Sequence, residues 1–151
     1  MYEIINGIPA YIFPICFAFQ FMLFPLISSF CSVPTFNTVF ILYLAKDYFF
    51  PMDYILSAHH VICITYTLMF SKTRGDAKAT TVCEIGSGAY NLYVFTRHYN
   101  FHVPEMHAFY FIVMTLSNVC ALHYVFHSNK PFFFKMTMLV LAIGREYFIF
   151  L

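Results

Sequence analysis

Six polar side chains within a largely apolar part of the sequence have the residue types and spacing that acid–base chemistry needs. They are Asp47, Asp53, His59, His60, Glu84 and Asn91. Asp53 and His60 are seven residues apart, close to two helical turns, so one helix face would carry both. Glu84 and Asn91 have the same spacing. Because a carboxylate that orients an imidazole is a familiar general-base arrangement, the pattern predicts a polar site shared by two helices.

The composition indicates that these helices lie in a membrane. Hydrophobic residues make up 61% of the 151 residues and charged residues 10%, where about 45–50% and about 25% are usual in soluble domains. The mean hydropathy is +0.72. Eight Lys or Arg and seven Asp or Glu residues cannot cover a soluble globule of this length, which excludes a soluble enzyme. The net charge of +1 also gives no clustered basic face for nucleic acid.

Interruptions in the apolar sequence predict six membrane-spanning helices, judged against the roughly 20 residues that a spanning helix needs. The predicted spans are residues 8–29, 35–50, 52–70, 81–96, 105–126 and 132–151. Residues 71–80 form the only strongly polar loop. We therefore predict an all-α fold: a polytopic membrane bundle of six transmembrane helices, forming one domain over residues 1–151.

Basic residues predict the orientation of the bundle, because short cytosolic loops carry an excess of Lys and Arg. The basic residues of two loops are Lys72, Arg74 and Lys78 in one, and Lys130 and Lys135 in the other. With six spans these loops lie on the same side, which we expect to be cytosolic. The N-terminus carries Glu3 and no basic residue. We therefore expect it on the other side, with no cleaved signal peptide.

The remaining cysteines and histidines do not predict a metal site. The cysteines are Cys16, Cys31, Cys63, Cys83 and Cys120. They are scattered and form no CxxC pair, so we interpret them as small buried hydrophobic residues. His98 with His102, and His123 with His127, have the HxxxH spacing of membrane di-iron desaturases and hydroxylases, yet an HxxHH box is absent. The predicted orientation also separates the two pairs across the membrane. We therefore expect interfacial histidines, with no metal and no other cofactor.

Two segments resemble the signature of the TLC-domain family of multi-span membrane proteins. Residues 46–60, KDYFFPMDYILSAHH, contain an Asp, a second Asp a few residues later and a His-His pair. Residues 84–91, EIGSGAYN, contain a Glu, small residues and an Asn seven positions after the Glu. The order and separation of the segments also fit. With its motifs, the resemblance covers roughly residues 35–100.

The resemblance implies a protein of the endoplasmic reticulum membrane that acts in membrane lipid homeostasis. The family includes ceramide synthases, translocon-associated membrane proteins and non-catalytic members tied to lipid composition. The expected partner is a membrane lipid, either a sphingolipid or a fatty acyl-CoA. A ceramide synthase-like enzyme would perform acyl-CoA-dependent N-acyl transfer, with His59 or His60 as the base and Asp53 beside it. The binding residues would be Asp47, Glu84 and Asn91.

Residues 74–83 separate this chain from the ceramide synthases. Those enzymes carry a His-Asp-x-x-Asp motif before the Glu, whereas this segment reads RGDAKATTVC and keeps only the Arg-Gly pair. Two alternatives to a general role in lipid homeostasis therefore stay open. One is an N-acyltransferase, and the other is a structural or translocon-associated protein without a ligand.

The predicted helix boundaries also place the polar residues relative to one another. His59 and His60 point about 100° apart on a helix, so we expect them to line adjacent walls of one cavity. If the fourth span begins at residue 81, Glu84 lies at the cytosolic mouth of that cavity. Asn91, two turns further in, would then be the residue that contacts the imidazoles.

Overall fold

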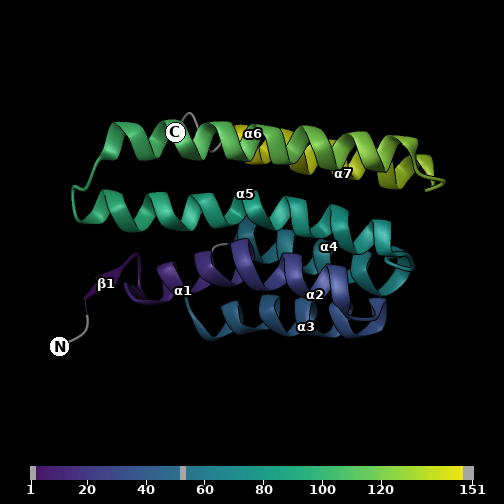
Figure 1. Ribbon diagram of the computed structural model, residues 1–151, viewed down its shortest axis with the longest axis horizontal. Coiled ribbons are helices and arrows are strands. Elements are labelled where there is room, and N and C mark those ends of the chain that lie inside the picture. Colours follow the sequence, from purple (N-terminus) through teal and green to yellow (C-terminus); the bar gives the residue numbers. More distant parts are fainter. Residues whose placement is uncertain (1–2, 52–53, 148–151) are drawn as a thin grey trace.

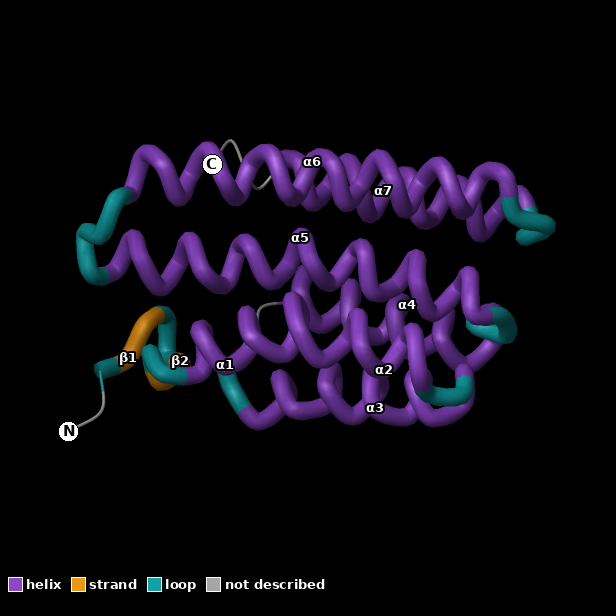
Figure 2. The backbone as a smooth tube through the Cα atoms, in the orientation of Figure 1, coloured by secondary structure: helices purple, strands orange, loops and turns teal. Residues whose placement is uncertain are grey.

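The computed structural model describes residues 3–51 and 54–147, and over these residues the chain is a helical bundle with a short β-hairpin near its N-terminus (Figures 1 and 2). The first helix comprises α1, a π-helical turn η1 and α2. The bounds are β1 Ile4–Ile5, β2 Ile8–Pro9, α1 Ile12–Ala18, η1 Phe19–Leu23, α2 Phe24–Phe30, α3 Val33–Ala45, the 3₁₀ turn η2 Lys46–Phe49, α4 Tyr54–Phe70, α5 Arg74–His98, α6 Val103–His127 and α7 Phe132–Tyr147. The helical character of the bundle is thus as predicted.

The first predicted span begins too early. β1 pairs with β2 antiparallel, so the helix starts at Ile12 rather than at residue 8. Asn6 and Gly7 connect the strands with φ angles of 50° and 82°. An Asn-Gly pair is the most common two-residue hairpin turn because both residues tolerate positive φ. That dipeptide was the sequence signal for the hairpin.

The π-helical turn η1 lies between α1 and α2 in the first helix. The amide of Phe24 donates to the carbonyl of Phe19, a bond that spans five residues. Pro25 follows and has no amide hydrogen to continue the regular pattern. The wide turn changes the direction of the side chains in η1, and Gln20 within it is buried.

Helix α5 begins seven residues before the predicted span, so most of the predicted loop at residues 71–80 is helical. Thr73 caps the helix: its hydroxyl accepts the Asp76 amide at 3.2 Å. In return the Asp76 carboxylate accepts the Thr73 amide at 2.9 Å. This reciprocal capping box satisfies the free amides of the first turn, which lets a polar sequence start a helix.

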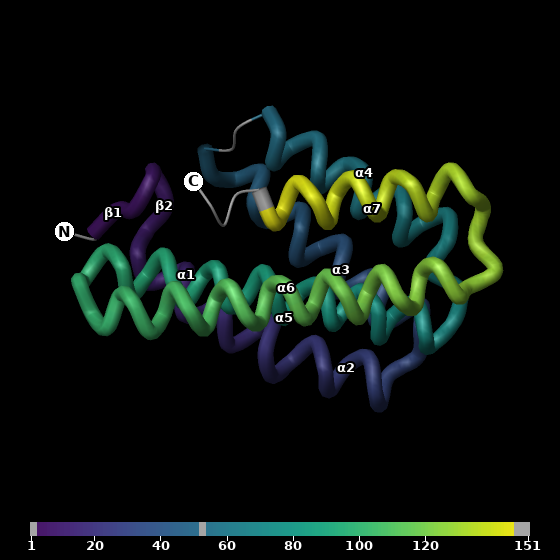
Figure 3. The backbone as a smooth tube through the Cα atoms, turned by 90° about the horizontal axis from the view of Figure 1, so that it is seen from above, coloured from purple at the N-terminus to yellow at the C-terminus, as the bar shows by residue number. Residues whose placement is uncertain are grey.

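Helix α5 lies at the centre of the bundle, between the first helix and α6 (Figure 1). Helices α4 and α7 lie on the same flank (Figure 3), where the Tyr66 and Phe134 rings stack with their centres 4.5 Å apart. Two glycines allow the close approach. A Cβ added to Gly86 would lie 2.2 Å from the Ser117 hydroxyl of α6, and one added to Gly88 would lie 2.8 Å from the Phe21 ring of the first helix. The polar segment around Glu84 is therefore enclosed by helices on both sides.

Two helices are long and apolar enough to cross a membrane by length and composition, among the residues that the structure describes. They are Ile12–Phe30, with 19 residues, and Val103–His127, with 25 residues. Neighbouring helices cover little of either helix, since only 28% and 33% of their most apolar segments are buried. Tyr54–Phe70 is apolar but shorter, and α3 has 13 residues, against the roughly 20 that a span needs.

Many polar side chains are buried in the bundle and many large apolar ones are exposed, although Phe24, Phe36 and Phe40 form part of a buried apolar core. Phe30, Phe49 and Phe133 are more than 79% exposed. The buried polar residues are Gln20, Ser28, His60, Thr67, Ser71, Asp76, Thr81, Glu84, Thr96, Ser117 and Asn118. Soluble proteins rarely expose apolar surface on this scale, which agrees with the two helices that are long and apolar enough to cross a membrane.

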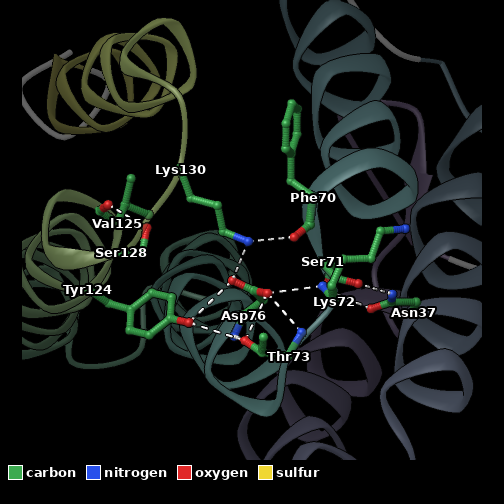
Figure 4. A network of polar contacts seen from close by, with 10 residues as sticks. All are labelled: Asn37, Phe70, Ser71, Lys72, Thr73, Asp76, Tyr124, Val125, Ser128 and Lys130. Atoms are coloured by element: carbon green, nitrogen blue, oxygen red, sulfur yellow. Dashed lines mark hydrogen bonds and ion pairs between the residues drawn. The ribbon is translucent and has the colours of Figure 1, made fainter.

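The two basic loops lie at the same end of the bundle, as predicted. The Lys130 ammonium, in the α6–α7 connection, lies 2.9 Å from the Asp76 carboxylate of α5. Figure 4 shows the network around this pair. Asp76 also accepts hydrogen bonds from the amides of Lys72 and Thr73 and from the hydroxyls of Thr73 and Tyr124. This end, which carries the α2–α3, α4–α5 and α6–α7 connections, is called the basic end below.

The Asp76 network predicts a loss of stability in acid. Burial raises the pKa of Asp76, but hydrogen bonds from Lys130 and from the Lys72 and Thr73 amides outweigh it and hold the pKa below the ordinary 3.8. A lowered folded-state pKa stabilises the fold fully above the unfolded value, and this contribution disappears as the pH falls through the folded value. At pH values below about 4 we expect the unfolding temperature in detergent to decrease. The decrease should be smaller in the Asp76→Asn variant. Equal acid sensitivity in the two proteins would contradict the assignment.

Candidate functional site

A cavity of about 60 Å³ lies between α4, α5, α6 and α7. Its polar lining comprises His59, Cys63, Thr80, Cys83, Glu84, Ser87, Asn118 and Arg145. Its apolar lining comprises Phe40, Ile62, Tyr66, Ala79, Ala121, Leu122, Val125, Met138, Leu141 and Ala142. This volume is enough for a few water molecules or one small polar group, and the apolar walls suit a hydrocarbon chain. We call it the His59–Glu84 cavity.

Glu84 lies deeper than its predicted position at the cavity mouth. It is 8% exposed, and it lies ten residues from the start of α5, about 15 Å along the axis. His59 lies eleven residues before the end of the antiparallel α4. Both residues therefore reach a similar depth, and they line one cavity. The sequence prediction was wrong because it started the helix at residue 81.

Asn91 does not contact an imidazole, contrary to the sequence prediction. Its amide donates to the Gln20 side-chain oxygen at 2.8 Å, while the Gln20 amide donates to Glu84 at 2.7 Å. Gln20 thus links two polar positions of α5 that are two turns apart. Because the π-helical turn buries Gln20 against α5, Asn91 satisfies its polar atoms there and is absent from the cavity lining.

The two histidines lie in different environments. The His59 imidazole lines the cavity, with Nε2 3.5 Å from the Cys63 sulfur one turn along α4. His60 is absent from that lining and is buried, with Nε2 3.7 Å from the Asp47 carboxylate. The prediction that both imidazoles line one cavity is therefore wrong. The angle of about 100° between consecutive helical residues is enough to turn His60 toward α3 and η2.

Asp47 belongs to a small ionic cluster at the end of α3. Its carboxylate lies 2.5 Å from the Lys46 ammonium, which lies 3.8 Å from the centre of the Tyr43 ring. The neighbouring His60 Nδ1 is buried and has no hydrogen-bond partner among the described residues. The predicted site residue Asp53 lies outside the described residues. Asp47 and His60 are thus brought together, and neither lines the His59–Glu84 cavity.

The sequence analysis did not single out two charged residues of α7: Arg145, which lines the cavity, and Glu146, which binds the lining residue Asn118. Arg145 donates to the Cys83 carbonyl at 2.7 Å and to the Ser87 hydroxyl at 3.2 Å, both on α5. Glu146 accepts hydrogen bonds from Asn118 and from Thr115 on α6. Charged side chains within a predicted span are a general signal of function, and applying that rule to residues 132–151 would have found both.

The HxxxH pairs lie at opposite ends of the bundle, as predicted. His98 and His102 flank the α5–α6 connection, and His123 and His127 lie at the end of α6. Helix α6, with 25 residues and a length of about 37 Å, connects the two ends. The His127 ring nitrogen Nδ1 lies 2.8 Å from the His123 carbonyl, a contact within one helix.

The His59–Glu84 cavity combines an imidazole, a carboxylate and a guanidinium inside largely apolar walls. Among the described residues no hydrogen bond joins this imidazole to this carboxylate, because His59 lies beside Cys63 and Glu84 accepts from Gln20. A histidine can transfer protons by itself, and a mixed polar and apolar lining is typical of small-molecule sites. No family model, curated protein or solved structure matches the chain. The geometry and chemistry of the residues themselves therefore carry the functional argument.

Proposed function

We propose that this chain is a multi-pass membrane protein of TLC-domain type, which acts in membrane lipid homeostasis by binding or modifying a lipid in the His59–Glu84 cavity. One observation carries the proposal: His59 and Glu84, from the two segments that resemble the family signature, line the same cavity. We also propose that the protein lies in the endoplasmic reticulum membrane, because the resemblance to that family implies this location.

The distribution of polar and apolar side chains supports membrane embedding of helices beyond the two long apolar ones. Helix α5 carries charged residues, but its polar positions Asp76, Thr81, Glu84 and Thr96 are buried against neighbouring helices. In a bilayer, a polar helix is tolerated when its polar groups are satisfied inside the bundle. Hydropathy along one helix therefore underestimates the number of spans in a bundle of this kind.

The proposed orientation has the basic end in the cytosol, and glycosylation mapping tests it. An N-glycosylation acceptor with flexible flanks, inserted into the 128–131 connection, should stay unmodified because the lumenal glycosylation machinery cannot reach it. The same insertion at residues 99–102, at the opposite end, should be modified. Gel mobility before and after glycosidase treatment measures both. Glycan on the 128–131 insertion would reverse the orientation.

The cavity would hold a small polar group of a lipid beside His59 and Glu84, and the lipid chain would extend out of it past the apolar residues Val125 and Met138. The location of His59 favours N-acyl transfer as a second candidate. As a base, His59 would take the proton from an amine as its nitrogen attacks the acyl-CoA carbonyl; the C–N bond forms, the C–S bond breaks, and the CoA thiol leaves. His60, absent from the cavity, would have no role in that step.

The experiment that tests the proposal compares the two histidines in cells that lack their own ceramide synthases. Expression of the native chain should change the cellular lipid profile. His59→Ala should reduce that change at least about 100-fold, the usual loss on removing a general base, with normal protein abundance. His60→Ala should lower the folded yield and leave the change per folded molecule intact, because His60 packs against Asp47 outside the cavity.

His123→Ala is the matched control, since His123 is an exposed histidine at the far end of α6. It should leave both abundance and lipid profile unchanged. A lipid change that persists in His59→Ala would exclude catalysis by His59. An unchanged lipid profile on expression of the native chain, together with loss of folded yield in both His59→Ala and His60→Ala, would favour the structural or translocon-associated alternative.

A further inference from the structure

A second cavity, of about 330 Å³, opens at the basic end, and each residue that lines it has a polar or charged group at the end of its side chain or on a short one. Its lining residues are Thr73, Asp76, Tyr124, His127, Ser128, Asn129 and Lys130. Figure 4 shows five of them, with the Lys130 ammonium between α5 and the end of α4. We call this cavity the Lys130 pocket. It lies at the opposite end of α5 from the α5–α6 connection and shares no lining residue with the His59–Glu84 cavity.

The charge around the Lys130 pocket is strongly positive. Five of the eight basic residues lie at this end of the bundle: Lys72, Arg74, Lys78, Lys130 and Lys135. Asp76 is the one acidic residue there among the residues that the structure describes. At the opposite end, Lys46 and Arg97 are balanced by Glu3, Asp47 and Glu105. The two ends therefore present different electrostatic surfaces to the medium.

The single acid does not cancel this charge where a ligand would approach. Asp76 is 0% exposed, and its carboxylate already accepts hydrogen bonds from its network. Lys130 uses two of its three ammonium hydrogens on Asp76 and the Phe70 carbonyl, at 2.9 and 2.6 Å, which leaves one donor. Asn129 is exposed beside it and supplies an amide.

The position of the pocket favours a lipid over a soluble anion. Phe132 and Phe133 follow Lys130 closely in the chain and are 75% and 82% exposed. Basic side chains at the ends of spanning helices reach the headgroups of a membrane, while the neighbouring exposed phenylalanine rings would contact its apolar core. A group held in the Lys130 pocket would therefore lie at headgroup level.

From the charge, the free donors and this position, we infer that the Lys130 pocket binds the phosphate of an anionic phospholipid headgroup. The inference rests on the membrane embedding of the proposed function but not on its lipid-binding cavity. Basic residues near a membrane surface each increase binding to anionic lipid about fivefold. The basic end would thus select anionic lipids for the annulus around α6 and α7.

The chain contains no tryptophan, so a single introduced tryptophan reports the local lipid. Phe132→Trp places the reporter at the basic end, and Phe101→Trp, also an exposed phenylalanine, places it at the opposite end. The full chain would be reconstituted in equimolar vesicles of phosphatidylserine and phosphatidylcholine, with one lipid brominated at a time to quench the fluorescence. At Phe132→Trp, brominated phosphatidylserine should be preferred about fivefold. At Phe101→Trp the two lipids should quench equally.

A matched pair of charge variants assigns the preference to the pocket. Asn129→Asp adds a negative charge inside the pocket, and Ser32→Asp adds one at an exposed position of the same end, where Asp is also a good helix cap. In the Phe132→Trp background, Asn129→Asp should abolish the preference and Ser32→Asp should keep it. Loss in both variants would mean that diffuse charge, not the pocket, selects the lipid.

Three other results would overturn the inference. Equal quenching by both lipids at Phe132→Trp, or the same preference at both reporters, would overturn the inference. Loss of the preference in inorganic phosphate, but not in chloride of equal ionic strength, would indicate a site for free phosphate and overturn the assignment to lipid. Absence of quenching by either lipid at both reporters would instead refute the membrane embedding, and with it the proposed function.

Discussion

Asp76→Ala should lower the free energy of unfolding by about 3–5 kcal/mol, the cost of removing one partner of a buried ion pair. Asp76 is fully buried, and its carboxylate accepts hydrogen bonds from the Lys72 and Thr73 amides, from two hydroxyls and from Lys130. The substitution removes the acceptor that these donors share, and it leaves the Lys72 and Thr73 amides without one among the described residues. It also removes half of the capping box that starts α5.

Titration with SDS in mixed micelles, followed by circular dichroism, measures this loss. Lys78→Ala is the control, since Lys78 is an exposed charged residue in the same part of α5. It should change the free energy of unfolding by less than about 0.5 kcal/mol. A loss below about 1 kcal/mol for Asp76→Ala would mean that water satisfies the donors and that the network does not hold the helices together.

Gln20→Leu should destabilise the bundle by about 2–4 kcal/mol, because a leucine of similar size can satisfy neither partner of the glutamine. Gln20 is 2% exposed and joins Glu84 to Asn91 through two hydrogen bonds. The variant leaves a buried carboxyl group and an amide without partners. Thermal unfolding in detergent measures the change, and Met22→Leu, at an exposed position two residues away, is the control.

A double variant separates the hydrogen bonds from simple packing. If the cost comes from the stranded Glu84 carboxyl, Gln20→Leu combined with Glu84→Leu should be more stable than Gln20→Leu alone, because replacing both partners with apolar groups removes the unsatisfied atoms. If the double variant is less stable than either single one, packing around Gln20 matters more than its hydrogen bonds. The same variants would show whether Glu84 is needed for the lipid changes.

Local signals in the sequence predicted several of the breaks between helices, although not the first residues of α1 and α5. Proline at positions 34, 51 and 131 and the polar residues near them interrupt the apolar runs, and helices do end close to these points. Such breaks depend on residues next to one another in the chain, because proline lacks an amide donor and restricts the residue before it. Basic residues likewise indicated that residues 72–78 and 130–135 share one end.

Depth within the bundle could not be predicted from the apolar run alone. The capping box at Thr73 and Asp76 adds seven residues to α5, which moves Glu84 about 10 Å along the axis. That shift brings Glu84 level with His59 and takes Asn91 past the cavity. Thr73 and Asp76 have the spacing of a capping box in the sequence. The strongly polar composition of residues 71–80 nevertheless favoured a loop, so the sequence alone did not show that a helix begins there.

The sequence by itself determined a helical, apolar bundle and identified His59 and Glu84 as polar residues that need partners. Only the tertiary structure decided which partners those are. Gln20 reaches Glu84 across 64 residues of chain, and Arg145 reaches Cys83 across 62. His60 turns to Asp47 while its neighbour His59 faces the cavity. Hydropathy and periodicity describe each helix separately, whereas the rotation and depth of a helix are fixed by the side chains that pack against it.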